Sequence, residues 1–179
     1  GWNMGQFSDV SQMFSGAEKL VKVDLSDTVY KNGVNAWNFF AYNNALTDVD
    51  LTNARNITRE IINGYVQAIK NSNATAIDLT TTTLNSNVTN LELLFSSIPN
   101  VKSINLSGWD TSRVTNIYAT FFNDESLESV NISGWNLSNA ESIASLFYGD
   151  SNLSNIDLSN VNFGNNIGDN SVSFAYVGN

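Results

Sequence analysis

The stretch "INLSGWDTSRV", residues 104–114, is followed 26 residues later by "VNISGWNLSNA", residues 130–140. Weaker copies occur on both sides, and each contains the unit apolar–Asp/Asn–apolar–Ser/Thr. The central aliphatic residue of this unit recurs every 26 to 28 residues, at Leu25, Leu51, Leu79, Leu106, Ile132 and Leu158. A period of this length indicates a solenoid, in which each repeat forms one coil and buries its apolar face against the next coil.

Each repeat carries further apolar positions that predict its local structure. A phenylalanine precedes a Leu or Val by six residues in most copies, at Phe14, Phe40, Phe95, Phe121 and Phe147. The spacing i, i+3, i+7 of Val114, Ile117 and Phe121 predicts a short helix, and the following Leu-x-x-Val-x-Leu run alternates as a strand does. We therefore predict an α/β solenoid with a parallel β-sheet on one face and short helices on the other.

The third copy, between Leu51 and Leu79, is the longest and lacks the phenylalanine. Its apolar residues predict a longer amphipathic helix, with Ile57, Ile61, Ile62, Tyr65 and Ile69 on the buried side. At the two ends, Gly1-Trp2 aligns with Gly108-Trp109, and Phe174 takes the phenylalanine position. We expect residues 1–179 to form one domain of about six to seven coils of 26–28 residues, a fragment cut in mid-repeat at both ends.

The composition excludes several classes of function. The chain has no His and no Cys, which removes Ser-His and Cys-His nucleophiles, His-ligated zinc and thiolate metal sites. Its net charge of −9 argues against nucleic acid and against anionic membranes. No stretch has the roughly 18 consecutive apolar residues that crossing a bilayer requires, so we expect no membrane insertion.

The acidic residues also argue against catalysis and against bound metal. A glycosidase needs only two carboxylates, but the acids here recur with the period, as a scaffold places them. No D-x-[DN]-x-[DN]-G calcium loop is present, so a calcium site is the least favoured interpretation of the acids. We expect a protein that is not an enzyme, with no cofactor and no metal.

Candidate binding residues follow from the strand pattern. Val23 and Leu25 point into the core, so Asp24 points out of the concave strand face. Equivalent outward residues should form ladders about 4.8 Å apart. The candidates on this face are Asp24, Asp48, Asp50, Asp78, Asn105, Asn131 and Asp157. These side chains either are solvated and accept turn hydrogen bonds or form a binding surface for a protein or glycan.

The tryptophans and two arginines are further candidates. Trp2, Trp109 and Trp135 share one repeat position, where an indole ladder either packs at a corner of the coil or stays exposed for sugar rings to stack on. Trp37 belongs to the segment expected to be helical, and we assign it to the core. Arg55 and Arg59, in the irregular third copy, are secondary binding candidates.

The run S107-G-W-D-T-S-R-V114, then Ile117 and Phe121, then L127-E-S-V-N-I-S133, resembles the repeat of BspA-like leucine-rich-repeat surface proteins. Such proteins are common in lactic acid bacteria, other Gram-positive bacteria and mycoplasmas. The resemblance implies a leucine-rich-repeat, right-handed coil in a secreted, wall-associated protein. The expected function is an adhesin that binds a host or neighbouring-cell protein or glycan, such as mucin, matrix protein or polysaccharide, beside further repeats or domains of the same chain. The alternative is a structural spacer or stalk that presents another binding module.

Overall fold

The computed structural model describes residues 2–164, 173, 174 and 177. The chain forms two compact units, one made of residues up to 73 together with 81–88, the other of residues 74–80 and 89 onward. Both units are stacks of short coils whose strands are parallel and lie one repeat apart in sequence. The predicted β-solenoid is therefore confirmed.

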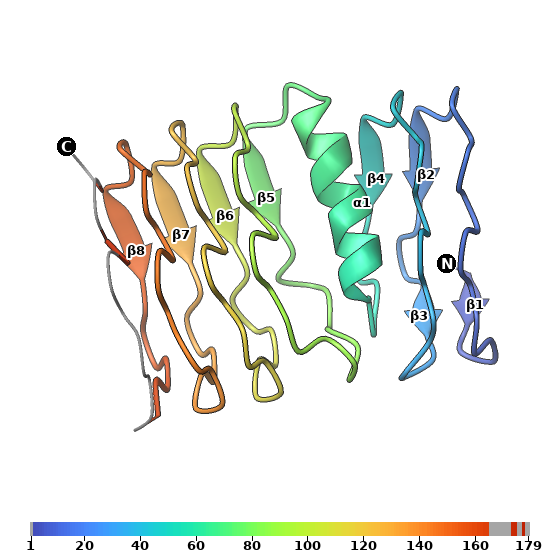
Figure 1. Cartoon of the computed structure of the whole chain (residues 1–179). Coiled ribbons are helices and arrows are strands. Elements are labelled where there is room, and N and C mark those ends of the chain that lie inside the picture. The colour runs from blue at the N-terminus through green and yellow to red at the C-terminus, as the bar shows by residue number, and fades with distance from the viewer. Residues whose placement is uncertain (1, 165–172, 175–176, 178–179) are drawn as a thin grey trace. The chain divides into compact units, whose positions relative to one another are not determined.

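In the first unit, the strands pair one period apart (Figure 1). The strand β2 (Lys22–Asp24) lies parallel to β4 (Asp48–Asp50), with Val23 opposite Val49. A shorter pair, β1 (Asn3–Met4) and β3 (Val29–Tyr30), lies nearby in the sequence. Because the register matches the repeat, equivalent residues of successive coils lie side by side.

In the second unit, four strands form one parallel sheet, side by side in Figure 1. They are β5 (Ala76–Asp78), β6 (Ser103–Asn105), β7 (Ser129–Asn131) and β8 (Asn155–Asp157). The central residue of each strand pairs with the central residue of the next, in the order Ile77, Ile104, Val130, Ile156. The strands and their register are as the repeat predicts within each unit.

The core consists of columns of identical or similar side chains. Leu25 and Leu51 are buried in the first unit, and Leu79, Leu106 and Ile132 in the second. The phenylalanine rings also form a column, with Phe95, Phe121 and Phe147 stacked at centroid distances of 5.9 and 5.3 Å. Phe174 continues it 5.4 Å from Phe147, as the sequence predicts.

The prediction of short helices opposite the sheet is wrong for the regular coils, because the chain forms successive turns there. The cause is visible in the backbone. The residues two before and two after the repeat-position phenylalanines Phe14, Phe40, Phe95, Phe121 and Phe147 have positive φ, as at Ala119 (52°) and Asn123 (59°). A left-handed residue every fourth position interrupts an α-helix. The freed N–H groups instead bond to the next coil, for example Asn123 N to Tyr148 O at 2.8 Å.

The longer helix predicted in the third copy is confirmed as α1 (Arg59–Lys70). Thr58 caps its N-terminus by accepting the N–H of Ile61, and the buried face includes Ile61, Ile62 and Val66. It is the one α-helix in the described part of the chain. Within those same residues, no helix has the length and apolar character that crossing a bilayer requires.

Candidate functional site

The Asp or Asn of every repeat unit forms a turn at the end of its strand. Its Oδ1 accepts the backbone N–H of the residue two positions later, with N–O distances of 2.9 Å at Asp24 and Asn131 and 3.0 Å at Asp78. In several coils the Ser or Thr hydroxyl donates to the same oxygen, as Ser26 does at 2.6 Å. The unit apolar–Asp/Asn–apolar–Ser/Thr therefore recurs because each coil needs this Asx turn.

The turn uses one oxygen of each ladder side chain and leaves the other polar atom facing outward. At Asp78 and Asp157 that atom is Oδ2, and at Asn105 and Asn131 it is the Nδ2 amide, given Oδ1 as the turn acceptor. The register places these four residues in a row across β5 to β8. The row therefore presents two hydrogen-bond donors flanked by two acceptors.

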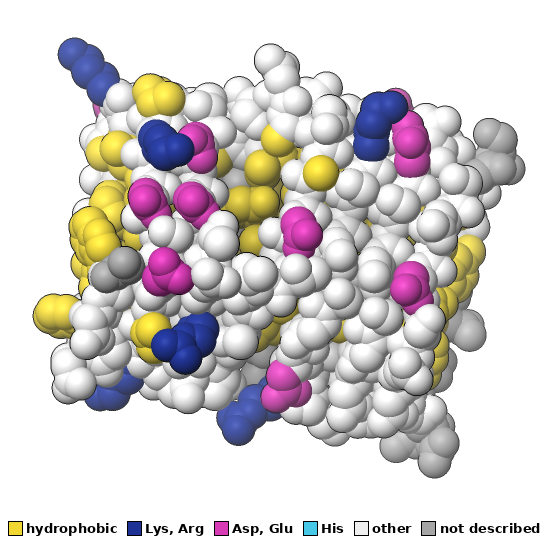
Figure 2. All heavy atoms as spheres, turned by 180° about the vertical axis from the view of Figure 1, so that it is seen from behind, with side chains coloured by type: hydrophobic (Ala, Val, Ile, Leu, Met, Phe, Trp, Pro, Cys, Tyr) yellow, Lys and Arg dark blue, Asp and Glu magenta, His cyan; other side chains and the backbone are white. Residues whose placement is uncertain are grey.

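This row lies in a shallow hollow of about 380 Å³ on the strand face of the second unit. Ser103, Ser129 and Asn155 add further polar groups beside the row. Figure 2, which views the molecule from the side opposite to Figure 1, shows charged side chains that are sparse among uncharged polar groups. The second unit thus offers a mostly neutral, hydrogen-bonding surface.

The strand face of the first unit is more strongly charged. Its ladder brings together Asp24, Asp48 and Asp50, and the Lys22 ammonium lies 2.7 Å from the Asp48 carboxylate. The hydrogen bond and the charge of Asp48 raise the pKa of Lys22, whereas hydrogen bonds from Ser26 lower the pKa of Asp24. The three aspartates predicted for this strand face therefore lie together here, and Lys22 partly offsets their charge.

Two of the three repeat-position tryptophans are core residues and cannot contact a ligand on the surface. Trp109 and Trp135 are 2% and 0% exposed and stack in parallel at 6.3 Å with an interplanar angle of 2°. Their Nε1 atoms donate to the carbonyls of Leu79 and Leu106, at 3.2 and 3.0 Å. The packing interpretation is confirmed for these two, and their assignment as aromatic contacts is wrong.

The other aromatic and basic candidates are placed differently. Trp2 is 50% exposed, while Trp37, which we assigned to the core, is 58% exposed, so that assignment is wrong. A turn residue can point outward where a helical apolar stripe would point inward, and this accounts for Trp37. Arg55 is exposed in a bridge with Val29, and the half-buried Arg59 begins α1.

Two buried carboxylates were missed by the sequence reasoning. Asp124 and Asp150 follow their phenylalanines by three residues, and both are almost completely buried. Asp124 Oδ1 accepts the Ile98 N–H at 2.6 Å, and Asp150 Oδ1 accepts the Asp124 N–H at 2.7 Å. Burial raises the pKa of Asp150 to about 7. The two aspartates recur 26 residues apart among apolar residues, and this pattern could have indicated that both are buried.

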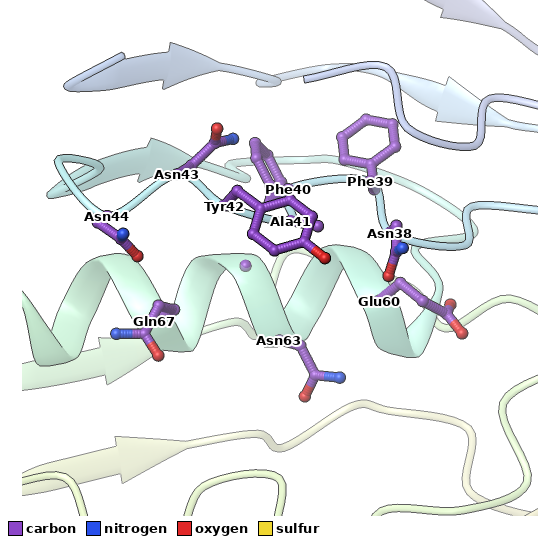
Figure 3. A pocket seen from close by; sticks show the side chains of 11 residues that line it. Asn38, Phe39, Phe40, Ala41, Tyr42, Asn43, Asn44, Glu60, Asn63 and Gln67 are labelled. Carbon is purple, nitrogen blue, oxygen red and sulfur yellow. The ribbon is translucent and has the colours of Figure 1, made fainter. Parts of the chain in front are cut away.

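A groove in the first unit was also missed. It lies between the turn segment 38–44 and α1, and its volume is about 360 Å³ (Figure 3). Glu60, Asn63 and Gln67 line it from the helix, and Tyr42 lines it from the turn. The sequence shows polar residues at 60, 63 and 67, a spacing that places them on one face of a helix. It does not show that the turn segment 38–44 faces them, because that segment lies about one repeat earlier in the chain.

The described residues define the chain as a parallel β-solenoid with polar strand faces. Among them, no group of three or more acidic, His or Cys side chains is arranged to hold a metal ion. The chain belongs to the family described as "Mycoplasma protein of unknown function, DUF285", whose model matches residues 62–177, more than half of the sequence. Comparison with curated proteins and with solved structures gives no match.

Proposed function

We propose that this chain is a non-catalytic binding module of an adhesin on a bacterial cell wall. It recognises a protein or glycan of a host or neighbouring cell through its polar strand face. The proposal is supported by the resemblance of the repeat around Gly108-Trp109 to that of BspA-like surface proteins of Gram-positive bacteria.

The observation that carries the proposal is the row of outward atoms in the second unit. In each of these side chains the neighbouring Oδ1 accepts the hydrogen bond of the Asx turn, as at Asn105 and Asn131, and this bond holds the group in place. Side chains held in this way lose little conformational entropy when a ligand binds. Donors at the centre and carboxylate oxygens at Asp78 and Asp157 suit a ligand rich in hydroxyl or amide groups.

The experiment exploits the division between the turn atom and the outward atom. In the double variant Asn105→Asp/Asn131→Asp, Oδ1 still closes the turn, but both amide donors become carboxylate oxygens. Binding of the purified chain to mucin, matrix proteins and a glycan array should fall at least tenfold, because each lost hydrogen bond contributes about 1 kcal/mol. The melting temperature should fall by only a few degrees, because the turns persist although carboxylates now lie side by side across β5 to β8.

Asn136→Asp provides the matched control. Asn136 Oδ1 also accepts the N–H two residues later, from Ser138 at 3.1 Å, but Asn136 lies outside the strands and does not line the hollow. This variant should bind as the unaltered chain does. If the double variant binds as well as the control does, the binding site does not lie on the strand face of the second unit.

The second candidate function is a spacer that presents another binding module. The observation favouring it is the hydrogen bonding between successive coils within each unit, on the strands and on the turns alike, as in Phe95 N to Thr120 O at 2.9 Å. Such bonds resist extension along the stack. If the unaltered chain binds none of the ligands above, this function replaces adhesion through the strand face.

A further inference from the structure

We propose that the groove between residues 38–44 and α1 is a second binding site, and that its ligand is an uncharged oligosaccharide. The site lies wholly in the first unit and shares no residue with the strand faces. This second site can therefore be tested independently of the proposed function. Its support comes from the groove's construction, from its rim and from one exposed aromatic residue in left-handed backbone.

The groove exists because a glycine lies where the helix meets the turn. A Cβ added at Gly64 would lie 2.1 Å from Cδ2 of Phe40, closer than any side chain tolerates. Glycine inside a helix costs about 1 kcal/mol relative to alanine. At this position it lets α1 approach the Phe40 ring, so the buried Phe39 and Phe40 support a floor from which the rim side chains rise.

The rim consists of polar side chains from both sides (Figure 3). They are Glu60, Asn63 and Gln67 on α1 and Asn38, Tyr42 and Asn44 on the turn. Asn38 and Glu60 lie at one end of the groove in Figure 3, and Asn44 and Gln67 lie at the other. Gln67 donates through Nε2 to Asn71 at 3.0 Å, so its carbonyl oxygen remains for a ligand.

Tyr42 is an unusual residue for its backbone conformation. In the described coils the residue two after the repeat-position phenylalanine has positive φ, and besides Tyr42 it is Gly16, Ser97, Asn123 or Gly149. In the sequence, Tyr176 takes the same position after Phe174. Tyr42 has φ +63° and a side chain that is 73% exposed. A bulky side chain in left-handed backbone is unfavourable, and an exposed ring gains little packing in return. Local rules broken without a packing gain occur at functional sites.

The chemistry of this rim matches a carbohydrate. Side-chain amides supply both donors and acceptors, which sugar hydroxyl groups need in pairs. The exposed Tyr42 ring, which Figure 3 places over the middle of the groove, offers a flat apolar face for the C–H side of a pyranose and a hydroxyl at its tip. Glu60 is the one charged lining residue, so a polyanion is disfavoured. A peptide ligand would need apolar pockets, but the phenylalanines of the lining are buried.

Titration of the purified chain with neutral tetrasaccharides of glucose, mannose, galactose and N-acetylglucosamine tests the proposal. Binding is followed by calorimetry and by saturation-transfer NMR. At least one should bind with a Kd in the micromolar to low millimolar range, the range usual for small polar ligands. Tyr42→Gly should weaken that binding at least tenfold without lowering the melting temperature, since glycine accepts the positive φ. Tyr42→Phe should retain most of the affinity.

Asn63→Leu gives an independent measurement, because it removes an exposed rim amide while keeping a good helix former, and it should also weaken binding severalfold. Tyr118→Ala is the matched control, since Tyr118 is an exposed aromatic of the second unit outside the groove. It should leave affinity unchanged. The proposal is overturned if no tetrasaccharide binds, if Tyr42→Gly and Asn63→Leu both bind normally, or if only Asn105→Asp/Asn131→Asp abolishes binding.

Discussion

The buried carboxyl of Asp150 should make the stability of this protein fall as the pH rises toward neutrality. Asp150 is 0% exposed, and its Oδ1 accepts the Asp124 N–H at 2.7 Å. Its Oδ2 has no hydrogen-bond partner among the described residues. Burial opposes ionisation and raises the pKa of Asp150 from 3.8 to about 7, although the Asp124 hydrogen bond acts in the opposite direction. The perturbation that isolates this effect is Asp150→Asn.

The sign follows from proton binding. Between pH 3.8 and about 7, the folded protein retains the Asp150 proton that the unfolded chain has released, so the free energy of unfolding falls as the pH rises. Each unit of pKa difference corresponds to about 1.4 kcal/mol, so roughly 4 kcal/mol is lost across this window. Asparagine keeps an oxygen for the Asp124 N–H and does not ionise. The variant should therefore lack this slope, even if its amide costs about 1–3 kcal/mol at every pH.

The assay is urea unfolding at intervals between pH 4.5 and pH 8. The difference in unfolding free energy between Asp150→Asn and the unaltered chain should shift by about 3–4 kcal/mol in favour of the variant across this range. Asp110→Asn is the control. Hydrogen bonds from Ser112 lower the pKa of Asp110, so Asp110 stays ionised throughout, and its variant should follow the unaltered chain in parallel. Parallel curves for Asp150→Asn as well would refute the reasoning.

Two further predictions concern packing. Trp135→Ala should lower the free energy of unfolding by about 3–5 kcal/mol in urea titrations, because it removes a buried indole and its bond to Leu106, whereas Trp2→Ala should cost less than about 1 kcal/mol. An effect of equal size at both positions would contradict the burial difference. Gly64→Ala should lower the melting temperature despite alanine's helix propensity, and Phe40→Leu in the same chain should restore part of it. A rise in melting temperature with Gly64→Ala alone would show that Phe40 does not limit the approach of α1.

The strands and their register could be predicted from the sequence because two independent periods agree. The coil repeat placed Val23 opposite Val49 and Ile104 opposite Val130, and the alternation within each strand decided which residues point inward. A shift by one residue would turn Asp24 or Asn105 into the core. Only one register therefore satisfies burial, and the pattern of a single chain is enough to find it.

The turns opposite the strands could not be predicted in the same way. The spacing of Val114, Ile117 and Phe121 fits one face of a helix, but it fits a chain of short turns equally well. The two structures differ in backbone conformation. Ala119 and Leu93 have left-handed φ, but neither residue type indicates this conformation in the sequence. The misplacement of Trp37 follows from the same ambiguity. In the third copy, where a capping Thr58 and twelve uninterrupted residues are present, the helix prediction succeeded.

The candidate sites differ in how far they could be predicted, and the reason is physical. A solenoid repeats whatever every coil requires, so the ladder residues Asp78 and Asn105 first serve the Asx turn, and only their outward atoms are available for binding. Selection for a particular ligand acts without this constraint at residues that break the repeat. The helix α1 is such a departure, and the exposed Tyr42 lies across one groove from it. The repeated positions therefore specify the scaffold, and the irregular positions are where specificity for one ligand is best sought.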